Sequence, residues 1–198
     1  MAETQTTQTT KGPRLSPNVV VRHESPNQSE RSSVALNLIV LHDTEGANIP
    51  HSTSDLSGLG DFFARTATQA SSHVATDSDG NSARFVSDRR KAWHCAAYNS
   101  ASLGIEQIGF ASQSRREWQS AQLRETARWI AFWAHRYNIP IRRATVAGGT
   151  VTRSGVIRHM DLGVLGGGHS DPGANFPFGR VLTLARTFAA GHFLRGPA

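Results

Sequence analysis

The chain has 198 residues, of which 38% are hydrophobic and 18% are charged. This size and composition favour one folded domain and exclude a chain that is disordered throughout. No stretch approaches the roughly 18 consecutive apolar residues of a membrane span, and the first residues lack the apolar core of a signal peptide. We therefore expect a monomeric protein made in the cytoplasm without a signal peptide and without stable membrane association.

Charge and cysteine content narrow the partners and the metal chemistry. The formal net charge is +6, from 21 basic and 15 acidic residues, which favours a polyanionic partner such as an anionic cell wall. The basic residues occur in short pairs typical of a solvated surface, so we expect no nucleic-acid partner. The single cysteine, Cys95, excludes an intrachain disulfide and a multi-cysteine metal site. Any metal must therefore be bound by histidine and carboxylate side chains.

The first part of the chain predicts a tail followed by a buried strand. Residues 1–33 are rich in Thr, Gln, Ser and Pro and carry little apolar periodicity, which predicts a flexible tail or a loosely docked arm. Residues 34–42, VALNLIVLH, predict a central strand that ends in His42. A side chain at the carboxyl end of such a strand points into the crevice where α/β sheets bind ligands.

The middle of the chain predicts a helix and three further strands. The helix starts at Ser54 or Asp55 and runs to about residue 67, and strands follow at 71–76, 83–86 and 103–110. In the last of these strands Glu106 shares a face with apolar side chains. Burying a carboxylate in this way costs free energy unless it is paired or lies near a cation.

The rest of the chain predicts two helices separated by a glycine-rich loop. Ser114 and Glu117 form a capping box for a helix to about Asn138, and a closing helix spans about 179–190. Between them, residues 155–178 (GVIRHMDLGVLGGGHSDPGANFPF) predict an ordered loop that orients histidine and aspartate side chains. We therefore predict a single α/β domain over residues 34–198, with helices flanking a mixed central sheet.

Four of the nine histidines lie where predicted strands end or meet turns: His42, His73, His94 and His159. Taken singly, each is more often a hydrogen-bonded structural histidine than a metal ligand. Catalytic zinc sites use three protein ligands of the histidine and carboxylate type and leave a fourth position open. The four histidines, together with Glu106 and Asp171, could supply such a set.

Five segments in order give the chain a family resemblance: IVLHDTEG, SSHVATDSDGN, AWHCAAYNSASLGIEQIGF, VIRHMDL and HSDPGANFPF. Together they resemble the type 2 N-acetylmuramoyl-L-alanine amidases, a family that includes many phage endolysins and is related to the animal peptidoglycan recognition proteins. The resemblance covers about residues 34–190. It implies a peptidoglycan substrate and a zinc cofactor.

The resemblance also implies roles for single residues. His42, His159 and Asp171 match the zinc ligands of the family, and Glu106 matches the glutamate that activates the water. His169 stands where many relatives carry a lysine that stabilises the oxyanion. Since a neutral imidazole is a weaker electrostatic partner than an ammonium, this substitution is a departure from the family pattern.

Three further residues are expected in or near the substrate groove. His94 is expected to line the groove or to support a metal ligand, and Asn99 is expected to contact substrate. His73 is assigned to the groove as well, with a supporting or structural role as the alternative. Val74 follows His73 where many relatives have tyrosine, so any contribution of that tyrosine is absent or supplied from elsewhere.

The function implied is zinc-dependent hydrolysis of the amide bond between the N-acetylmuramoyl lactyl group and L-alanine. We expect an endolysin of a phage or prophage, which reaches the wall through a membrane pore. The alternatives are an amidase that recycles cytoplasmic muropeptides and a peptidoglycan-binding module without catalysis. A cysteine amidase using Cys95 is disfavoured, because the adjacent His94 would point the other way in an extended segment.

Overall fold

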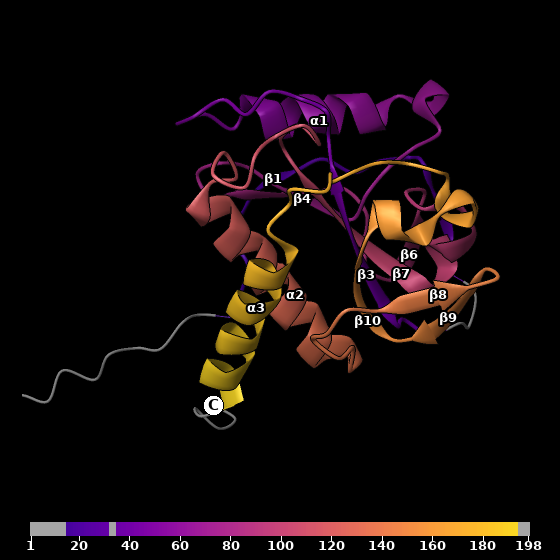
Figure 1. Ribbon diagram of the computed structural model, residues 1–198. Coiled ribbons are helices and arrows are strands. Elements are labelled where there is room, and N and C mark those ends of the chain that lie inside the picture. Colours follow the sequence, from indigo (N-terminus) through magenta and orange to yellow (C-terminus); the bar gives the residue numbers. More distant parts are fainter. Residues whose placement is uncertain (1–14, 32–34, 194–198) are drawn as a thin grey trace, which may run out of the picture.

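The computed structural model describes residues 15–31 and 35–193, which form a mixed sheet flanked by helices (Figure 1). This confirms the predicted fold class. The sheet has six strands, in the spatial order β1 (Val19–Arg22), β5 (Ser82–Arg84), β4 (Val74–Thr76), β7 (Ser102–Gln107), β3 (Leu38–Asp43) and β10 (Gly155–Arg158). Only the β4–β5 pair is antiparallel within this sheet. Two small sheets pair β2 (Gln28–Glu30) with β6 (Arg90–Ala92), and β8 (Thr145–Ala147) with β9 (Thr150–Arg153).

The two central strands are covered on both faces. Every residue of β3 and β7 is buried, which explains why β3 reads as a continuous apolar run rather than an alternating one. Ile39 and Leu41 belong to the main core cluster, which also contains Trp129 and Trp133. Leu38 and Val40 pack on the other side with a separate cluster. His42 follows the alternation of Leu38 and Val40, so it extends from that second face.

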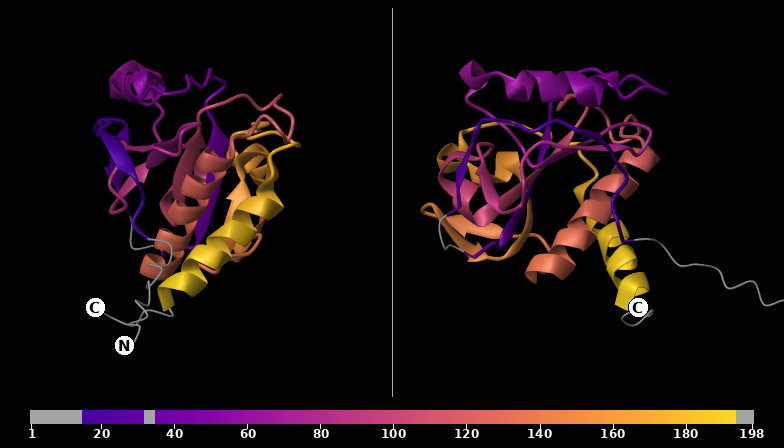
Figure 2. Two further views of the ribbon diagram at one scale, coloured as in Figure 1. Left: turned by 90° about the vertical axis from the view of Figure 1, so that its left-hand side faces the viewer. Right: turned by 180° about the vertical axis from the view of Figure 1, so that it is seen from behind.

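Helices α2 (Ser120–Tyr137) and α3 (Phe178–Phe193) lie side by side on one face of the sheet (Figure 2). Their apolar sides include Trp129, Trp133 and Val181, all buried. Helix α1 (Ser54–Ala64) runs across the top in Figure 1, and its Leu56 and Phe63 pack against residues of β4 and β5. No helix in the described ranges is long and apolar enough to span a membrane.

Residues 15–31 are ordered and pack on the domain, so the flexible tail is wrong for them and the docked arm is the alternative that fits. Strand β1 pairs with β5, β2 pairs with β6, and Leu15 joins the main core. The Ser25 hydroxyl donates a hydrogen bond to the carbonyl of Phe63 in α1 (2.7 Å). The two strands have four and three residues, too short for their half-buried pattern to stand out from the polar composition around them. Residues 1–14 and 32–33 of the expected tail lie outside the described residues.

Two other boundaries differ from the expectation. Helix α2 starts at Ser120, because the Ser114–Glu117 capping pair closes a separate turn and Gln119 is extended before the helix begins. Residues 155–158 of the expected loop form β10, which pairs in parallel with β3. This pairing carries the chain beside the end of β3, where His42 lies. The loop expected for residues 155–178 therefore begins only after the strand.

Candidate active site

Three side chains from distant parts of the sequence meet at one point. His42 comes from the carboxyl end of β3, His159 follows β10 directly, and Asp171 lies in the loop beyond it. The two Nδ1 atoms are 3.0 Å apart. Asp171 Oδ2 is 3.1 Å from each of them, and its Oδ1 is 2.9 Å from His159 Nδ1. All three residues are largely buried, so their ligand atoms face a common, shielded centre.

The backbone explains why these residues converge. Residues of β10 pair with those of β3 in parallel register, Arg158 opposite Leu41, so the next residue, His159, emerges beside His42. The loop that carries Asp171 is fixed by Gly173, whose φ is +85°. A Cβ at Gly173 would lie 2.0 Å from the carbonyl oxygen of Ala111, so only glycine allows this approach.

A chain of hydrogen bonds sets the tautomer of His42. The Ser102 hydroxyl donates its one proton to the carbonyl of Tyr98 (2.8 Å), so its oxygen accepts from His94 Nε2 (3.1 Å). The neutral ring of His94 then accepts at Nδ1 from His42 Nε2 (2.9 Å). His42 therefore carries its proton on Nε2 and presents the lone pair of Nδ1 to the centre.

His159 is fixed in the same tautomer by a different partner. Its Nε2 lies 2.8 Å from the carbonyl oxygen of Gly166, and because a carbonyl only accepts, this nitrogen carries the proton. Its Nδ1 lone pair therefore also faces the centre. Two imidazole lone pairs and a carboxylate within 3.1 Å of one another repel unless a proton or a metal cation lies between them, so the site is suited to bind a cation.

The donor set fits a zinc ion. Zinc–ligand bonds of roughly 2.0–2.1 Å in a tetrahedron place neighbouring ligand atoms about 3.3 Å apart, close to the separations in this structure. Burial lowers the pKa of His42 to about 4, so the ring is neutral at pH 7 and free to bind a metal. Burial opposes ionisation of Asp171, but when a proton occupies Nδ1 of His159 or His42 in place of a metal, its hydrogen bond to Asp171 holds the pKa of that carboxyl below its ordinary value. The open fourth position that catalytic zinc sites keep would lie toward the groove.

Glu106 lies on the strand next to His42, beside the group of three residues that could hold a metal. Its register partner in β3 is His42, and paired residues of parallel strands extend from the same face. The side chain is buried but lines the groove. Burial raises the pKa of this carboxyl well above its ordinary value, and the nearby carboxylates of Asp171 and Asp43 raise it further. A carboxyl whose protonated form is stabilised in this way suits a group that must both take up and release a proton.

His169 lies at the mouth of the site. Its ring stacks on that of His159, with 4.5 Å between ring centroids, and its Nδ1 is 4.0 Å from Asp171 Oδ1. The side chain is 61% exposed, in contrast to the three buried residues it borders. It therefore lies between the buried three-residue centre and the groove, the position expected for a group that faces substrate.

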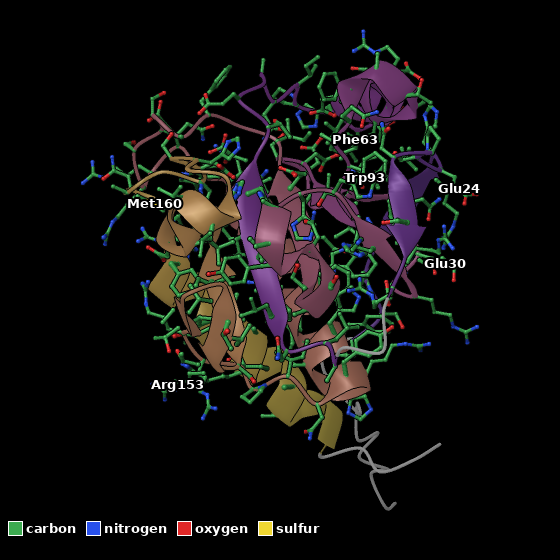
Figure 3. The ribbon with its side chains drawn as sticks, turned by 90° about the vertical axis from the view of Figure 1, so that its right-hand side faces the viewer. Glu24, Glu30, Phe63, Trp93, Arg153 and Met160 are labelled. Carbon is green, nitrogen blue, oxygen red and sulfur yellow. The ribbon has the colours of Figure 1, made fainter. Side chains whose placement is uncertain are left out.

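A groove of about 570 Å³ leads to this centre. One side is formed by Phe62 and Phe63 of α1 together with Trp93, and the other by the loop around Gly166. Figure 3 shows Phe63 and Trp93 on one side of β3, with Met160, the residue after His159, on the other. A groove of this volume matches those of small-molecule and substrate sites, which span roughly 300–1,000 Å³.

Of the three residues expected to contact substrate, two line the groove and one does not. His94 and Asn99 line the groove, and Asn99 Oδ1 also accepts from the backbone N–H groups of His94 (2.9 Å) and Cys95 (2.7 Å). His73 has no exposed surface; its Nδ1 accepts from the N–H of Gly104 (3.0 Å), and its ring packs edge-on against Trp133. A contact between His73 and substrate, the groove role expected from the sequence, is therefore wrong, and the structural alternative fits.

Sequence reasoning missed two residues that support the centre. Ser102 completes the hydrogen-bond chain to His42, and its position in the strand carries no local signal of that role. Gly104 makes room for the His94 ring, because a Cβ there would lie 2.8 Å from His94 Nδ1. A glycine inside a strand often marks such a close approach, so Gly104 could have been recognised from the sequence.

The Cys95 side chain contacts His94, contrary to the expectation that the two would point apart. Its Sγ lies 3.7 Å from His94 Nε2, because a 3-10 turn follows directly and the segment is not extended. Burial raises the pKa of the thiol to about 12. Since the thiolate is the nucleophilic form, this buried thiol is unsuited to act as one at neutral pH.

The mixed sheet brings two histidines and an aspartate together beside a buried glutamate, an arrangement suited to metal-assisted hydrolysis. The chain belongs to the N-acetylmuramoyl-L-alanine amidase family, because the model of that family matches residues 16–174. The resemblance noted in the sequence is thereby confirmed, and the chain is an enzyme of the class that cleaves peptidoglycan amide bonds. No curated protein sequence matches this chain.

Solved structures with the same fold include an AmpD derivative, an endolysin amidase and a staphylococcal hydrolase. A selenomethionine derivative of AmpD is 21% identical, with a TM-score of 0.61 over 83% of this chain and 93% of that one. The endolysin amidase LysCS from Clostridium intestinale URNW is 19% identical, with a TM-score of 0.57 over 84% and 94%. The hydrolase AmiA from Staphylococcus aureus is 16% identical, with a TM-score of 0.66 over 93% and 87%. At these identities the similarity establishes the fold alone.

Proposed function

We propose that this chain is a zinc-dependent amidase that hydrolyses the bond between the N-acetylmuramoyl lactyl group and L-alanine in cell-wall peptidoglycan. The observation that carries the proposal is the convergence of His42, His159 and Asp171, with both imidazole lone pairs directed at one centre. Glu106 on the adjacent strand supplies the group that such a reaction needs beside the metal. The site thus combines the three ligands with an acid–base group.

Each of the chain's own groups has a distinct part in the reaction. A bound zinc ion lowers the pKa of a water ligand to about 7 and polarises the substrate carbonyl. Glu106 accepts the proton of the attacking water and delivers it to the amine nitrogen of L-alanine as that group leaves. His169 donates a hydrogen bond to the oxygen that gains negative charge. The groove, with His94 and Asn99 in its wall, orients the muramoyl and peptide parts on either side of the scissile bond.

In the cell we propose that the protein acts as the endolysin of a phage or prophage, as a monomer that reaches the wall through a membrane pore. The net charge of +6 supports this role, because the wall is polyanionic. A recycling amidase would instead act on soluble muropeptides. Comparing kcat/KM on intact sacculi with kcat/KM on soluble anhydro-muropeptides distinguishes the two, and a large preference for the soluble substrate would overturn the endolysin role.

Mass spectrometry of digested peptidoglycan tests the reaction itself. Free stem peptides that begin with L-alanine are expected from wild type and not from His42→Ala or Asp171→Ala, and a chelator should abolish the wild-type product until zinc is restored. Release of other fragments, or unchanged product from the ligand variants, would contradict the proposal. Wall binding that persists while wild type releases nothing would favour the non-catalytic alternative.

A further inference from the structure

A second cavity, of about 220 Å³, lies at the start of α3 and is surrounded by arginines. Arg115, Arg143, Arg158 and Arg180 line it, and no acidic side chain lines it within the described residues. Asp161 pairs with Arg143 and Arg158 at its edge. Four positive charges against this one negative charge leave +3 around the cavity.

The contacts that hold these arginines in place use only some of their N–H donors. Arg158 makes two hydrogen bonds to Asp161 (2.9 and 2.7 Å) and Arg143 makes one (2.9 Å). Arg143 also lies 4.5 Å above the ring of Phe178. Each guanidinium has five N–H donors, so most of them remain for a ligand. Arg180 donates to the Ser120 hydroxyl at 3.0 Å, which fixes its direction.

The last part of the chain, which supplies most of the cavity's arginines, is rich in arginine and poor in acidic residues. Residues 140–198 contain seven arginines, no lysine, and only two acidic residues, Asp161 and Asp171. Asp171 is committed to the metal centre, and Asp161 is shared by two arginines. Like charges packed around a small cavity repel one another, and a bound multivalent anion relieves that repulsion. Guanidinium groups favour phosphate because their planar donors match its oxygens in pairs.

We propose that this arginine cavity binds a phosphate group of an anionic envelope polymer and so holds the amidase beside its substrate. The role of the bound polymer as a wall anchor rests on the proposed function above, whereas the binding itself does not. The cavity wall is close in the chain to the proposed site: it includes Phe176 and Pro177, which follow Asp171, and Arg158, which precedes His159.

Two other phosphate-bearing partners fit the surface less well. A membrane surface is bound through exposed apolar side chains as well as charge. The exposed large hydrophobic residues of the described chain lie elsewhere than in the cavity wall: Val20, Ile49, Phe62, Phe110, Val164 and Leu165. Single-stranded nucleic acid needs aromatic faces for stacking, and Phe176 and Phe178 are buried.

The test compares two triple variants that remove the same charge. The cavity variant carries Arg115→Gln, Arg143→Gln and Arg180→Gln, and it retains Arg158 to satisfy Asp161. The control carries Arg22→Gln, Arg89→Gln and Arg153→Gln, three exposed residues outside the cavity. Binding to a short poly(glycerol phosphate) chain is measured by calorimetry at low salt, with poly-L-glutamate of the same charge as the comparison polymer.

We expect the cavity variant to bind poly(glycerol phosphate) at least tenfold more weakly than wild type, and the control to change less than twofold. Wild type should also prefer the phosphate polymer to poly-L-glutamate by at least tenfold. Equal losses in the two variants, or equal binding of the two polymers, would show only diffuse charge attraction and overturn the proposal. Preferential, cavity-dependent binding to phosphatidylglycerol vesicles would overturn the assignment to a polymer.

Two further measurements keep folding and catalysis separate from binding. Arg115 has no hydrogen-bond or ion-pair partner among the described residues, so Arg115→Gln alone should fold normally and still weaken phosphate binding about threefold; unchanged binding would count against the proposal. The cavity variant should hydrolyse a soluble muramoyl peptide within twofold of wild type and intact walls at least fivefold more slowly. Equal rates on walls would remove the anchoring role, whereas absence of activity in every protein would refute the proposed function instead.

Discussion

Replacing Ser102 by alanine should weaken zinc binding, although the hydroxyl does not touch the metal centre. The change removes the acceptor of His94 Nε2–H, which lies 3.1 Å away. The His94 ring is then free to carry its proton on Nδ1. That N–H would face the N–H of His42 Nε2, because the two nitrogens are 2.9 Å apart. His42 would respond by moving its own proton to Nδ1, the atom that should bind the metal.

The magnitude is bounded by the cost of leaving one buried donor without an acceptor, because only the weak sulfur acceptor of Cys95, 3.7 Å away, would remain near His94 Nε2. That cost is about 1–3 kcal/mol, which corresponds to roughly 5- to 150-fold in affinity. Loss of a partner behind a metal-binding histidine typically costs about 10- to 100-fold. We therefore expect a zinc dissociation constant raised by about 10- to 100-fold, measured in competition with a chromophoric chelator.

A matched control separates this effect from general damage to the sheet. Ser82 is also a buried strand serine whose hydroxyl donates to a backbone carbonyl, that of Asn18 at 2.9 Å, but it lies outside the groove. Ser82→Ala should leave zinc affinity unchanged, and Ser102→Thr should restore most of it because the hydroxyl returns. Nitrogen-15 shifts of His42 report the tautomer directly. Wild-type affinity in a folded Ser102→Ala protein would refute the hydrogen-bond chain.

The other predictions concern four residues of the site and core. Glu106→Gln should bind zinc normally but lose about 10²- to 10⁴-fold in kcat; near-normal turnover would refute its role in proton transfer. Gly104→Ala should displace His94 and weaken zinc binding, which the same chelator competition measures. Iodoacetamide should not react with Cys95 in the folded protein, because burial raises the pKa of this thiol to about 12, and mass spectrometry should find it unlabelled. Burial lowers the pKa of His73 from 6.5 to about 3, so the unfolded chain takes up a proton first as the pH falls. The free energy of unfolding of the metal-free protein should thus decrease between pH 6.5 and 3, by at most about 1.4 kcal/mol per pH unit from this residue. Urea titrations of His73→Gln should show a shallower decrease, and an identical slope would contradict this account.

The sequence revealed the parts of the site that local pattern determines. His42 could be placed at the end of a buried strand, and Glu106 on a strand face, because apolar runs and alternation are visible in single segments. That Asp171 and His159 join His42 was implied by the family resemblance. No local pattern could have shown that they converge, because residues 42 and 171 are 129 positions apart and meet only through the pairing of β10 with β3.

The missed features share a physical cause, which is that tertiary contacts decide them. Ser102 and Ser82 are both strand serines, yet only Ser102 is linked through His94 to the candidate metal ligand His42. The capping box at Ser114 has the correct local geometry, but the chain between it and α2 turns so that Trp118 can pack against Phe176. His73 and His94 were similar candidates by position, and burial alone separates them.

The pairing of β10 with β3 also has a mechanical consequence. Strand β10 lies at the edge of the sheet, next to β3. The chain that follows β10 carries His159 and Asp171, which meet His42 at the end of β3. An ion held by all three residues would crosslink His42 to His159, 117 residues later in the chain, and to Asp171, 129 residues later. Peeling the edge strand away would then require release of the ion, and at a zinc concentration 1,000 times the dissociation constant this coupling adds about 4 kcal/mol to the free energy of unfolding. Removal of the metal should therefore leave the carboxyl-terminal third as the first part of the fold to open.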